Sequence, residues 1–561
     1  MRHQPLLRPP RGLAGVLVTT LTLVLVSCGG GAGSVGDAPK IGTSDIGAMP
    51  AQALHDGGTF RWALDLLPVN FNYNQLDGAE FNNFRVIGGV LPHLWLAQPD
   101  GTVRMNGDYL VSATLRSTNP EVVTYTLRDE ATWSDGTPIT WQDFRAQWQA
   151  LNGRNTAFQI ASSTGYKDIA SVERGASDKQ AVVTFATPFS DWKTVFDPLY
   201  PATTNTNPQV FNTGWAQGFP VTAGPFKVAR VDRTAMTITL VRNEKWWGHK
   251  PRLGRIIFRA IPRVAQFDAL ANNESDYVEV GTDVNSFTRA QRTPGVTVRK
   301  ALAPNYRHIT FNGRPGSILA DQQLRIVIQK GINRNAITQA LIGRIVPGAT
   351  PLGNHIYVQG EPGYQDDSQI IAYNPAEASH LLDALGWTRQ GADTRRKNGR
   401  ELVIRDVIPT ETPEADQEAR QVQQFLAAIG VKVDITPVPT REFFTKYLIP
   451  GNFDIAHFAW ISVPFPVTTS TSIYDTGNGV QQNFGGVGNN TINNLFAQAS
   501  REFDPARKVE LAHQIDREIW KTGHSLLLYQ RPDVWGVRQG IANIGAFGIS
   551  DPLYTNIGFT Q

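Results

Sequence analysis

The chain has 561 residues, of which 41% are hydrophobic and 18% are charged. This length exceeds what a single hydrophobic core supports, so several domains are expected. The formal net charge of +3 depends on Arg2, Arg8 and Arg11, and removing these three arginines brings it to zero. A neutral body lacks the basic face that nucleic acid requires, so we expect no nucleic-acid partner.

The N-terminal segment predicts export and lipid attachment. The apolar run 13–26 is too short to span a bilayer and fits a signal peptide over residues 1–27. It ends in Ser27-Cys28, which resembles a bacterial lipobox, and Cys28 is the only cysteine. We therefore expect lipid on Cys28 and a protein held at the outer face of the cell membrane, the alternative being an incidental cysteine in a cleaved signal. The Gly- and Ala-rich segment 28–56 predicts a flexible tether.

Ordered structure is expected to begin with a strand near residue 60. Phe60, Trp62 and Leu64 alternate with mostly polar neighbours, as in a half-buried strand. Thr140 followed by Asp143 predicts a helix start, because the hydroxyl and the acid suit the first turn. Further strands are predicted at the positions 122–127, 182–185, 236–241 and 255–261.

After residue 310, helices and strands alternate, which predicts an α/β domain. The segments 374–377 and 412–414 each place a capping residue before a proline and begin a helix. The segment 431–435 alternates as a strand that Pro437 is expected to end. The basic cluster 395–400 surrounds an Asn-Gly pair, so we interpret it as a solvated hairpin rather than an anion site.

The stretch 453–474 changes character in its middle. It is strand-like up to Trp460, after which Pro464 and Pro466 prevent further pairing and the hydroxyl residues 468–472 follow. A strand that ends in a loop with aromatic and hydroxyl groups is typical of ligand sites in α/β proteins. The alternative is a strand followed by an ordinary surface loop.

Catalytic motifs are missing from the sequence. It has no HExxH, no GxSxG and no P-loop, and its ten histidines show no close metal-ligand spacing. The GxGxxG match at 31–36 has no strand before it and no helix after it, so it does not indicate a nucleotide site. We expect no enzyme activity, no cofactor and no metal, although dispersed acids could still pair in space.

Ordered motifs carry a resemblance to a known family, and Trp246 and Trp247 within them are expected to serve packing. The motifs are Tyr125–Arg128, Trp133–Asp143, Ala223–Phe226, Leu240–Trp247, Phe311-Asn312, Leu324-Arg325, Ile332–Arg334, Ala378–Trp387, Gln424–Gly430 and Phe453–Ile455. In this order they resemble the family 5 extracellular solute-binding proteins, the dipeptide- and oligopeptide-binding components of ABC importers.

The resemblance implies an α/β, two-lobed, periplasmic-binding-protein-like fold of class II and the large cluster C type, which closes over its ligand by hinge motion. The expected partners are a small solute or peptide and ABC permease subunits, for a monomer anchored through lipid. The implied first lobe comprises 57–310 and 525–561, with an extra domain at about 90–219, and the second lobe comprises 311–524.

The resemblance also implies where a ligand lies. Peptide-binding members commonly hold the free amine with an aspartate just after the tryptophan of this strand, but Val463 stands at that position here. Asp454 and Asp475 are alternatives that do not match by position. The residues expected to line the cleft are Trp460, Phe465, Tyr474, Asn483 and Tyr306.

A second hypothesis follows from the segments 460–466, 482–485 and 528–532, which look like an actinobacterial lipoprotein branch of the family. That branch is similar to a mycobacterial lipoprotein linked to phosphatidylinositol mannoside and lipoarabinomannan synthesis. The chain could therefore bind or sense a glycolipid or its precursor without a transport role. Aromatic rings and amide groups would suit either a sugar or a modified peptide.

Overall fold

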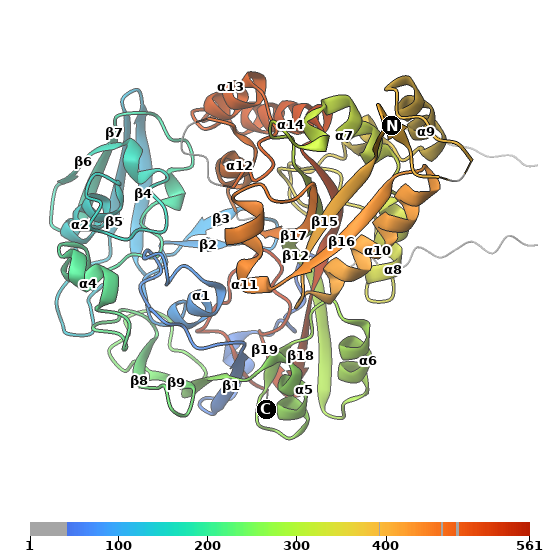
Figure 1. Ribbon diagram of the computed structural model, residues 1–561. Helices are drawn as coiled ribbons and strands as arrows, with labels where there is room; N and C mark the ends of the chain where they lie inside the picture. The colour runs from blue at the N-terminus through green and yellow to red at the C-terminus, as the bar shows by residue number, and fades with distance from the viewer. Residues whose placement is uncertain (1–41, 392, 462–463, 478–481, 561) are drawn as a thin grey trace, which may run out of the picture. The chain divides into compact units, whose positions relative to one another are not determined.

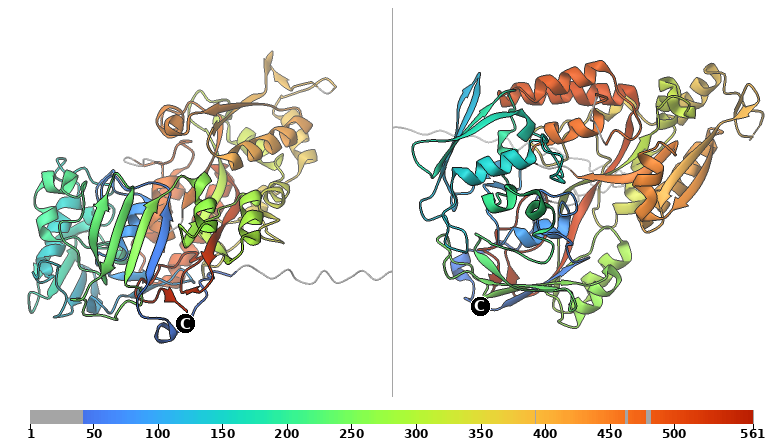
Figure 2. Two further views of the ribbon diagram at one scale, coloured as in Figure 1. Left: turned by 90° about the horizontal axis from the view of Figure 1, so that it is seen from below. Right: turned by 60° about the vertical axis from the view of Figure 1, so that its left-hand side comes forward.

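The chain forms a ten-stranded sheet, and the two longest strands of this sheet lie next to each other (Figure 1). The structure is a computed structural model that describes residues 42–391, 393–461, 464–477 and 482–560. The strands, in sheet order, are β16 (Lys432–Val438), β15 (Val403–Pro409), β17 (Ile455–Ile461), β12 (Val296–Phe311), β18 (Ser525–Arg538), β11 (Tyr277–Glu279), β1 (Thr59–Leu64), β10 (Arg255–Ala260), β9 (Thr237–Arg242) and β8 (Phe226–Asp232). The strands β1, β10, β9 and β8 are seen side by side in Figure 2 (left).

The antiparallel pairing of β12 with β18 is interrupted near its middle. The segment 296–302 of β12 pairs with 532–538, and the segment 306–310 pairs with 525–530. Residues 303–305 have no paired residue between these two stretches, and Pro304 has no amide hydrogen to donate. The sheet therefore has two halves that are joined by two continuous strands.

The two large hydrophobic cores follow the same division, whereas a smaller core contains residues of both parts, among them Val534 and Ile345. Ala301 and Trp535 pack in the core of one half, whereas Tyr306 and Leu527 pack in the core of the other. We call residues 42–302 with 532–560 the first lobe, and residues 306–530 the second lobe. The ends of both strands near 310 and 525, where the sequence placed the lobe boundaries, pack in the second core. The predicted boundaries remain a prediction.

A separate antiparallel sheet lies within the range 90–219 that was predicted to hold an extra domain. Its strands, in order, are β4 (Leu110–Thr118), β5 (Glu121–Leu127), β7 (Gln180–Phe185) and β6 (Ile169–Arg174). Helix α2 (Trp141–Leu151) packs on it and begins with the predicted cap, in which Thr140 N–H donates to Asp143 at 2.8 Å. This sheet stands at the left of Figure 1.

Short pairings and helices complete the described chain. The two-stranded pairs are β2 (Trp95–Ala97) with β3 (Val103–Met105), β13 (Arg396–Lys397) with β14 (Arg400–Glu401), and β19 (Ile541–Ala542) with β20 (Gly558–Phe559). The other helices are α1 (Phe81–Ile87), α3 (Ala202–Asn205), α4 (Pro208–Thr213), α5 (Arg263–Ala271), α6 (Val284–Arg292), α7 (Gln322–Lys330), α8 (Arg334–Ile342), α9 (Pro375–Ala384), α10 (Pro413–Ala428), α11 (Thr440–Glu442), α12 (Pro466–Tyr474), α13 (Asn490–Ala499) and α14 (Pro505–Thr522). Single turns lie at Ala51–Ala53, Tyr166–Asp168, Trp192–Thr194, Ile318–Ala320, Ser368–Ile371 and Phe443–Leu448.

Two local predictions in the second lobe were wrong in part. Strand β16 continues through Pro437 to Val438, which is tolerated because β16 is the edge of the sheet and needs no donor on its open side. The predicted hairpin forms, but Arg395 is only 1% exposed instead of solvated. Its guanidinium donates to the Asp383 carboxylate at 2.5 Å and to the Ile429 carbonyl at 2.7 Å.

The hydroxyl residues 468–472 form part of helix α12 and not the predicted loop. Pro466 occupies the first turn, where the missing amide hydrogen has no cost. The hydroxyls of Thr469 and Thr471 donate to the carbonyls four residues earlier, at 3.1 and 3.2 Å. Their polar groups are thus satisfied within the helix, which is why a hydroxyl-rich sequence can be helical here.

The ordered chain begins earlier than the predicted tether allows. Asp45 N–H donates to the Ala546 carbonyl at 2.8 Å, its carboxylate pairs with Arg299 at 2.9 Å, and Leu54 is 2% exposed. Residues 45–54 therefore pack on the C-terminal segment. The signal peptide and Cys28 lie outside the described residues. Over the part of the chain described, no helix combines the length and the apolar character that crossing a bilayer requires.

A buried ionic cluster joins strands of the second lobe to helix α10. The Glu418 carboxylate accepts hydrogen bonds from Arg307 at 2.9 and 2.6 Å, from Tyr529 at 2.8 Å and from His457 at 3.2 Å. The second ring nitrogen of His457 lies 3.0 Å from Asp406. Although burial opposes ionisation, Arg307 and His457 lower the pKa of Glu418 to about 2, and Asp406 and Glu418 raise the pKa of His457 to about 9.

Replacing Glu418 with Gln should lower the free energy of unfolding by about 3–5 kcal/mol, because Arg307 and His457 would remain buried without their carboxylate. Denaturant unfolding followed by tryptophan fluorescence measures this change. Asp416→Asn, on the exposed side of the same helix, is the matched control and should leave the midpoint unchanged. An equal, small effect of both substitutions would contradict the role given to the cluster.

Candidate ligand-binding site

A cavity of about 280 Å³ lies beside the interruption between β12 and β18. Helix α1 and residues of the C-terminal segment 547–555 form much of its first-lobe wall, and residues 303–305 line it at the strand crossing. Ile461, at the end of β17, lines it from the second lobe and is 56% exposed. The volume is near the lower end of small-molecule sites, about 300–1,000 Å³, so the cavity suits a small solute or part of a larger one.

Aromatic rings form much of the cavity wall. Tyr277 and Trp535 stack with ring centroids 4.2 Å apart and planes at 12°, and Trp62 meets Tyr277 edge-on at 5.0 Å. Phe81 is 58% exposed on helix α1. The buried rings fix one another in place, whereas Phe81 presents its surface to a ligand.

The same cavity contains charged groups of both signs. The Arg85 guanidinium lies over the rings of Phe81 and Trp535, at 4.0 and 4.6 Å from their centroids, and 3.5 Å from Glu279. Although burial opposes it, Arg263 and Arg85 hold the pKa of Glu279 below its ordinary value.

Two further carboxylates, Asp533 and Asp551, line the cavity without such pairing. Asp533 accepts hydrogen bonds from the Trp535 indole at 2.5 Å and from Gly548 N–H at 3.0 Å, and Asp551 accepts one from Ala97 N–H at 2.7 Å. Burial raises the pKa of each to about 6.

The five residues expected to line the cleft do not line this cavity. The Trp460 ring is parallel to the rings of His308 and Phe484, at 5.8 and 5.9 Å. The side-chain amide of Asn483 donates to the Val487 carbonyl at 2.9 Å. Phe465 precedes α12, and its carbonyl accepts the Thr469 hydroxyl. Their ligand contacts remain predictions.

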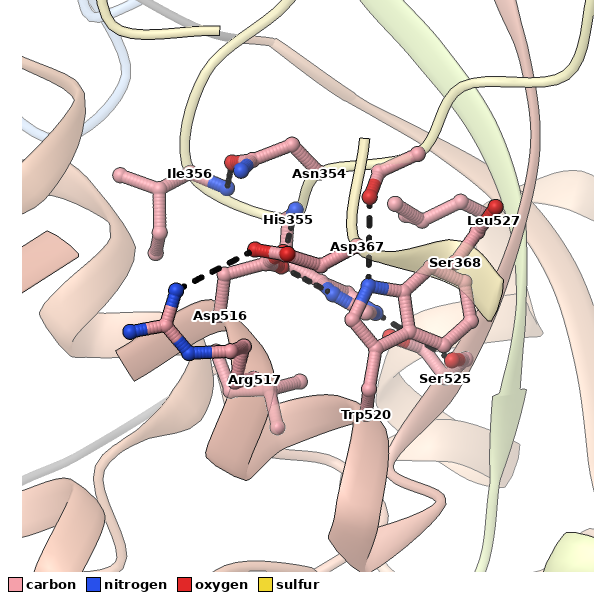
Figure 3. Close-up of polar contacts among 12 residues, drawn as sticks. Asn354, His355, Ile356, Asp367, Ser368, Asp516, Arg517, Trp520, Ser525 and Leu527 are labelled. Atoms are coloured by element: carbon pink, nitrogen blue, oxygen red, sulfur yellow. Dashed lines mark hydrogen bonds and ion pairs between the residues drawn. The ribbon is translucent and has the colours of Figure 1, made fainter. Parts of the chain in front are cut away.

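Tyr306 and Tyr474 belong to a buried polar network of the second lobe. Their hydroxyl oxygens are 3.3 Å apart, and Tyr306 donates to the His355 carbonyl at 3.4 Å. The His355 ring and its backbone N–H both contact Asp516 at 2.7 Å, as Figure 3 shows. Burial lowers the pKa of His355 to about 3 and raises that of Asp516 well above its ordinary value. The network supports the fold around Tyr306 and Tyr474.

The alternative acids for a peptide amine are also occupied elsewhere. Asp454 accepts Arg405 N–H at 2.8 Å, Asp475 accepts Gly477 N–H at 2.6 Å, and neither lines the cavity. Val463 lies outside the described residues. Among the residues that are described, no group of three or more His, Cys, Asp or Glu is arranged to hold a metal ion.

Sequence reasoning missed most of the cavity. Trp246, expected to serve packing, contacts Trp247 at 4.5 Å but also lines the cavity. Arg85, Asp533 and Asp551 carried no local signal. Asp533 and Trp535 follow shortly after the motif at residues 528–532, and Pro225 and Trp246 lie within other motifs that the sequence had singled out.

Asp533→Asn should stabilise the protein at pH 8 more than at pH 5. The pKa of Asp533 is about 6 in the folded protein against an ordinary 3.8, so its contribution to stability is present below pH 3.8 and is lost as the pH rises through 6. The gain at pH 8 is at most about 3 kcal/mol. Thermal unfolding of both proteins at the two pH values measures it, and an equal effect at pH 5 and pH 8 would show that the carboxylate charge is not the cause.

The chain is similar in sequence to known proteins. The sequence model of the bacterial extracellular solute-binding proteins, family 5 Middle, matches residues 109–482. The oligopeptide-binding protein OppA of Mycobacterium tuberculosis (strain ATCC 25618 / H37Rv) is 43% identical over 522 residues, covering 92% of this chain and 88% of that protein. The probable monoacyl phosphatidylinositol tetramannoside-binding protein LpqW of the same strain is 29% identical over 382 residues, covering 66% of this chain and 58% of that protein.

Solved structures share the fold. The periplasmic EDTA-binding protein EppA superposes with a TM-score of 0.85 at 24% identity, covering 93% of this chain and all of that chain. The oligopeptide-binding protein AppA from Bacillus subtilis, in complex with a nonapeptide, gives a TM-score of 0.74 at 16% identity and covers 91% of this chain and all of that one. The two-lobed fold is thus confirmed, and the chain belongs to the family 5 bacterial extracellular solute-binding proteins.

Proposed function

We propose that the chain is the peptide-binding component of an ABC importer and binds a peptide or peptide-like solute between its two lobes. The observation that carries this proposal is the aromatic cavity at the crossing of β12 and β18, lined from the second lobe by Ile461. The chain is 43% identical to an oligopeptide-binding protein over nearly its whole length, which supports a peptide as the solute.

The proposed protein is a lipid-anchored monomer outside the cytoplasmic membrane. Lipid on Cys28 would hold it at the outer face, and the segment from Cys28 to about residue 44 would act as the tether. The ligand-bound form would deliver its solute to permease subunits. The protein would bind its solute without changing it chemically.

Closure of the lobes is proposed from contacts far from the strand crossing. Asp191, in the first lobe, accepts hydrogen bonds from the Thr468 hydroxyl of α12 and the Lys508 ammonium of α14. The neighbouring Ser190 N–H donates to the Ser500 carbonyl at 2.9 Å. These contacts join the two lobes opposite the hinge that we place at residues 303–305. A ligand that touches both lobes would favour the same arrangement.

The glycolipid hypothesis has less support. The relative named as a phosphatidylinositol tetramannoside-binding protein is 29% identical and covers 66% of the chain. An inositol phosphodiester would place its negative charge among four cavity-lining carboxylates, those of Asp108, Glu279, Asp533 and Asp551. Unlike charges attract and like charges repel at short range, so this lining disfavours an anionic headgroup.

The proposed function is tested by the ligand that residues 42–561 retain on purification, identified by native mass spectrometry, and by tryptophan-fluorescence titration with synthetic peptides. Phe81→Ala should weaken peptide binding about tenfold, because the exposed ring is a cavity wall. Val264→Ala, an exposed apolar residue on α5 outside the cavity, is the control and should bind normally. A co-purified glycolipid, with no peptide bound at any concentration, would refute the proposal.

Asp191→Asn should weaken peptide binding about three- to tenfold by favouring the open arrangement, because it removes the charge that faces Lys508. The loss should appear mainly as faster dissociation, measured by stopped-flow fluorescence. Asp178→Asn, an exposed change in the same extra domain, is the control. An unchanged dissociation rate for Asp191→Asn would show that this contact does not contribute to closure.

A further inference from the structure

The cavity has an excess of acidic groups. Four carboxylates line it, whereas its lining contains one arginine, Arg85, and one histidine, His93. Both of these basic groups already have acidic partners. Arg85 lies 3.5 Å from Glu279, and His93 Nδ1 lies 3.1 Å from Asp197. They are therefore poorly placed to neutralise the remaining acids.

Asp533 and Asp551 are the two acids that lack a cationic partner. Within the described part of the chain, neither forms an ion pair, and both accept hydrogen bonds from N–H groups alone. The basic groups of the cavity lining, Arg85 and His93, are each paired with another acid, Glu279 and Asp197 respectively. Both residues are half-buried, and a carboxylate partly removed from water without a counter-charge is costly, as is common at functional sites.

Both carboxylates are held firmly in place. Each oxygen of Asp533 has one donor, the Trp535 indole or the Gly548 amide, and one oxygen of Asp551 binds the Ala97 amide. An ionised carboxylate accepts about four hydrogen bonds, so both side chains keep acceptor capacity toward the cavity. A ligand cation would meet acceptors that are already oriented.

The aromatic wall also suits a cation. The electron-rich face of an aromatic ring attracts ammonium and guanidinium groups. One such contact is already made within the cavity, since the Arg85 guanidinium lies 4.6 Å from the Trp535 centroid. Rings and carboxylates together form the chemistry that binds alkylammonium and guanidinium groups, whereas a neutral or acidic ligand leaves the carboxylates unpaired.

We propose that the cavity selects cationic ligands, whose ammonium or guanidinium group contacts Asp533 and Asp551 in the first lobe while the rest of the molecule extends toward Ile461 in the second lobe. This inference rests on the proposed peptide-binding function and specifies its ligand class. It places the recognition of the cation on the C-terminal segment. It also accounts for the valine at position 463, because the amine-binding acid expected there is not needed.

The test uses three peptide amides of one length, two with a single positive charge at different positions and one neutral. The first, Ala-Phe-Ala-Ala amide, has a free N-terminal amine. The second is its neutral N-acetyl form. The third is N-acetylated and has lysine in place of the third residue. Isothermal titration calorimetry with residues 42–561 then separates an N-terminal ammonium from a basic side chain as the source of the cation.

We expect at least one cationic peptide to bind about tenfold more tightly than the neutral peptide. Asp533→Asn and Asp551→Asn should each reduce this preference while the neutral peptide binds as before. Asp268→Asn, an exposed acid on α5, is the control and should keep the full preference. Thermal unfolding of each variant verifies that it is folded.

Equal binding of the neutral and cationic peptides by the unmodified protein would overturn the charge selectivity and leave the proposed peptide-binding function standing. An equal loss of affinity for neutral and cationic peptides in both variants would also overturn it, because the acids would then act on the shape of the cavity. Failure of every peptide to bind would overturn the proposed function together with this inference.

Discussion

The pairing of β12 with β18 is the constraint on which the rest of the structure depends. These strands belong to both halves of the sheet, and their register leaves residues 303–305 without a partner on β18, although Asn305 pairs with Ile461 of β17. The same three residues line the cavity. The interruption in backbone pairing thus lies between the two large cores, beside the cavity.

Carboxylates on the two sides of this crossing differ in whether they have cationic partners. Glu418 receives hydrogen bonds from Arg307, Tyr529 and His457, so its ionised form is stabilised and ties α10 to the sheet. Asp533 and Asp551 receive only N–H donors, so burial raises the pKa of both. A carboxylate whose charge is fully paired within the protein is typical of a structural group. A carboxylate whose charge is only partly paired is typical of a group that binds an external partner.

Local interactions made much of the fold predictable from the sequence. The caps at Thr140 and Asn374 were correctly identified because their partners lie three residues away. The continuation of β16 through Pro437 was not predictable, because it depends on the strand's position at the sheet edge. The hydroxyl residues of α12 were wrongly predicted to form a loop. A hydroxyl such as that of Thr469 donates to a backbone carbonyl one turn earlier, so it is compatible with a helix.

The cavity was harder to predict, because it combines residues from segments hundreds of positions apart. The stretch chosen from the sequence does reach it, but through Ile461 and not through Trp460. Adjacent residues of a strand point to opposite faces, so selecting the larger ring selected the other face of β17. The resemblance identified the family and the fold, whereas the identity of the wall residues required the three-dimensional arrangement.

The early start of ordered structure determines which part of the protein a membrane anchor would hold. Residues 45–54 are fastened to the C-terminal segment through the Asp45–Ala546 bridge and the pairing of Leu54 with Thr560. A pull on a lipid tether at Cys28 would therefore act on the first lobe, which carries Asp533 and Asp551, at a point next to the strand crossing, where Leu302 N–H donates to the Gly42 carbonyl at 3.0 Å. In a lipid-anchored form, the first lobe would stay in place relative to the membrane, and the second lobe would move during closure.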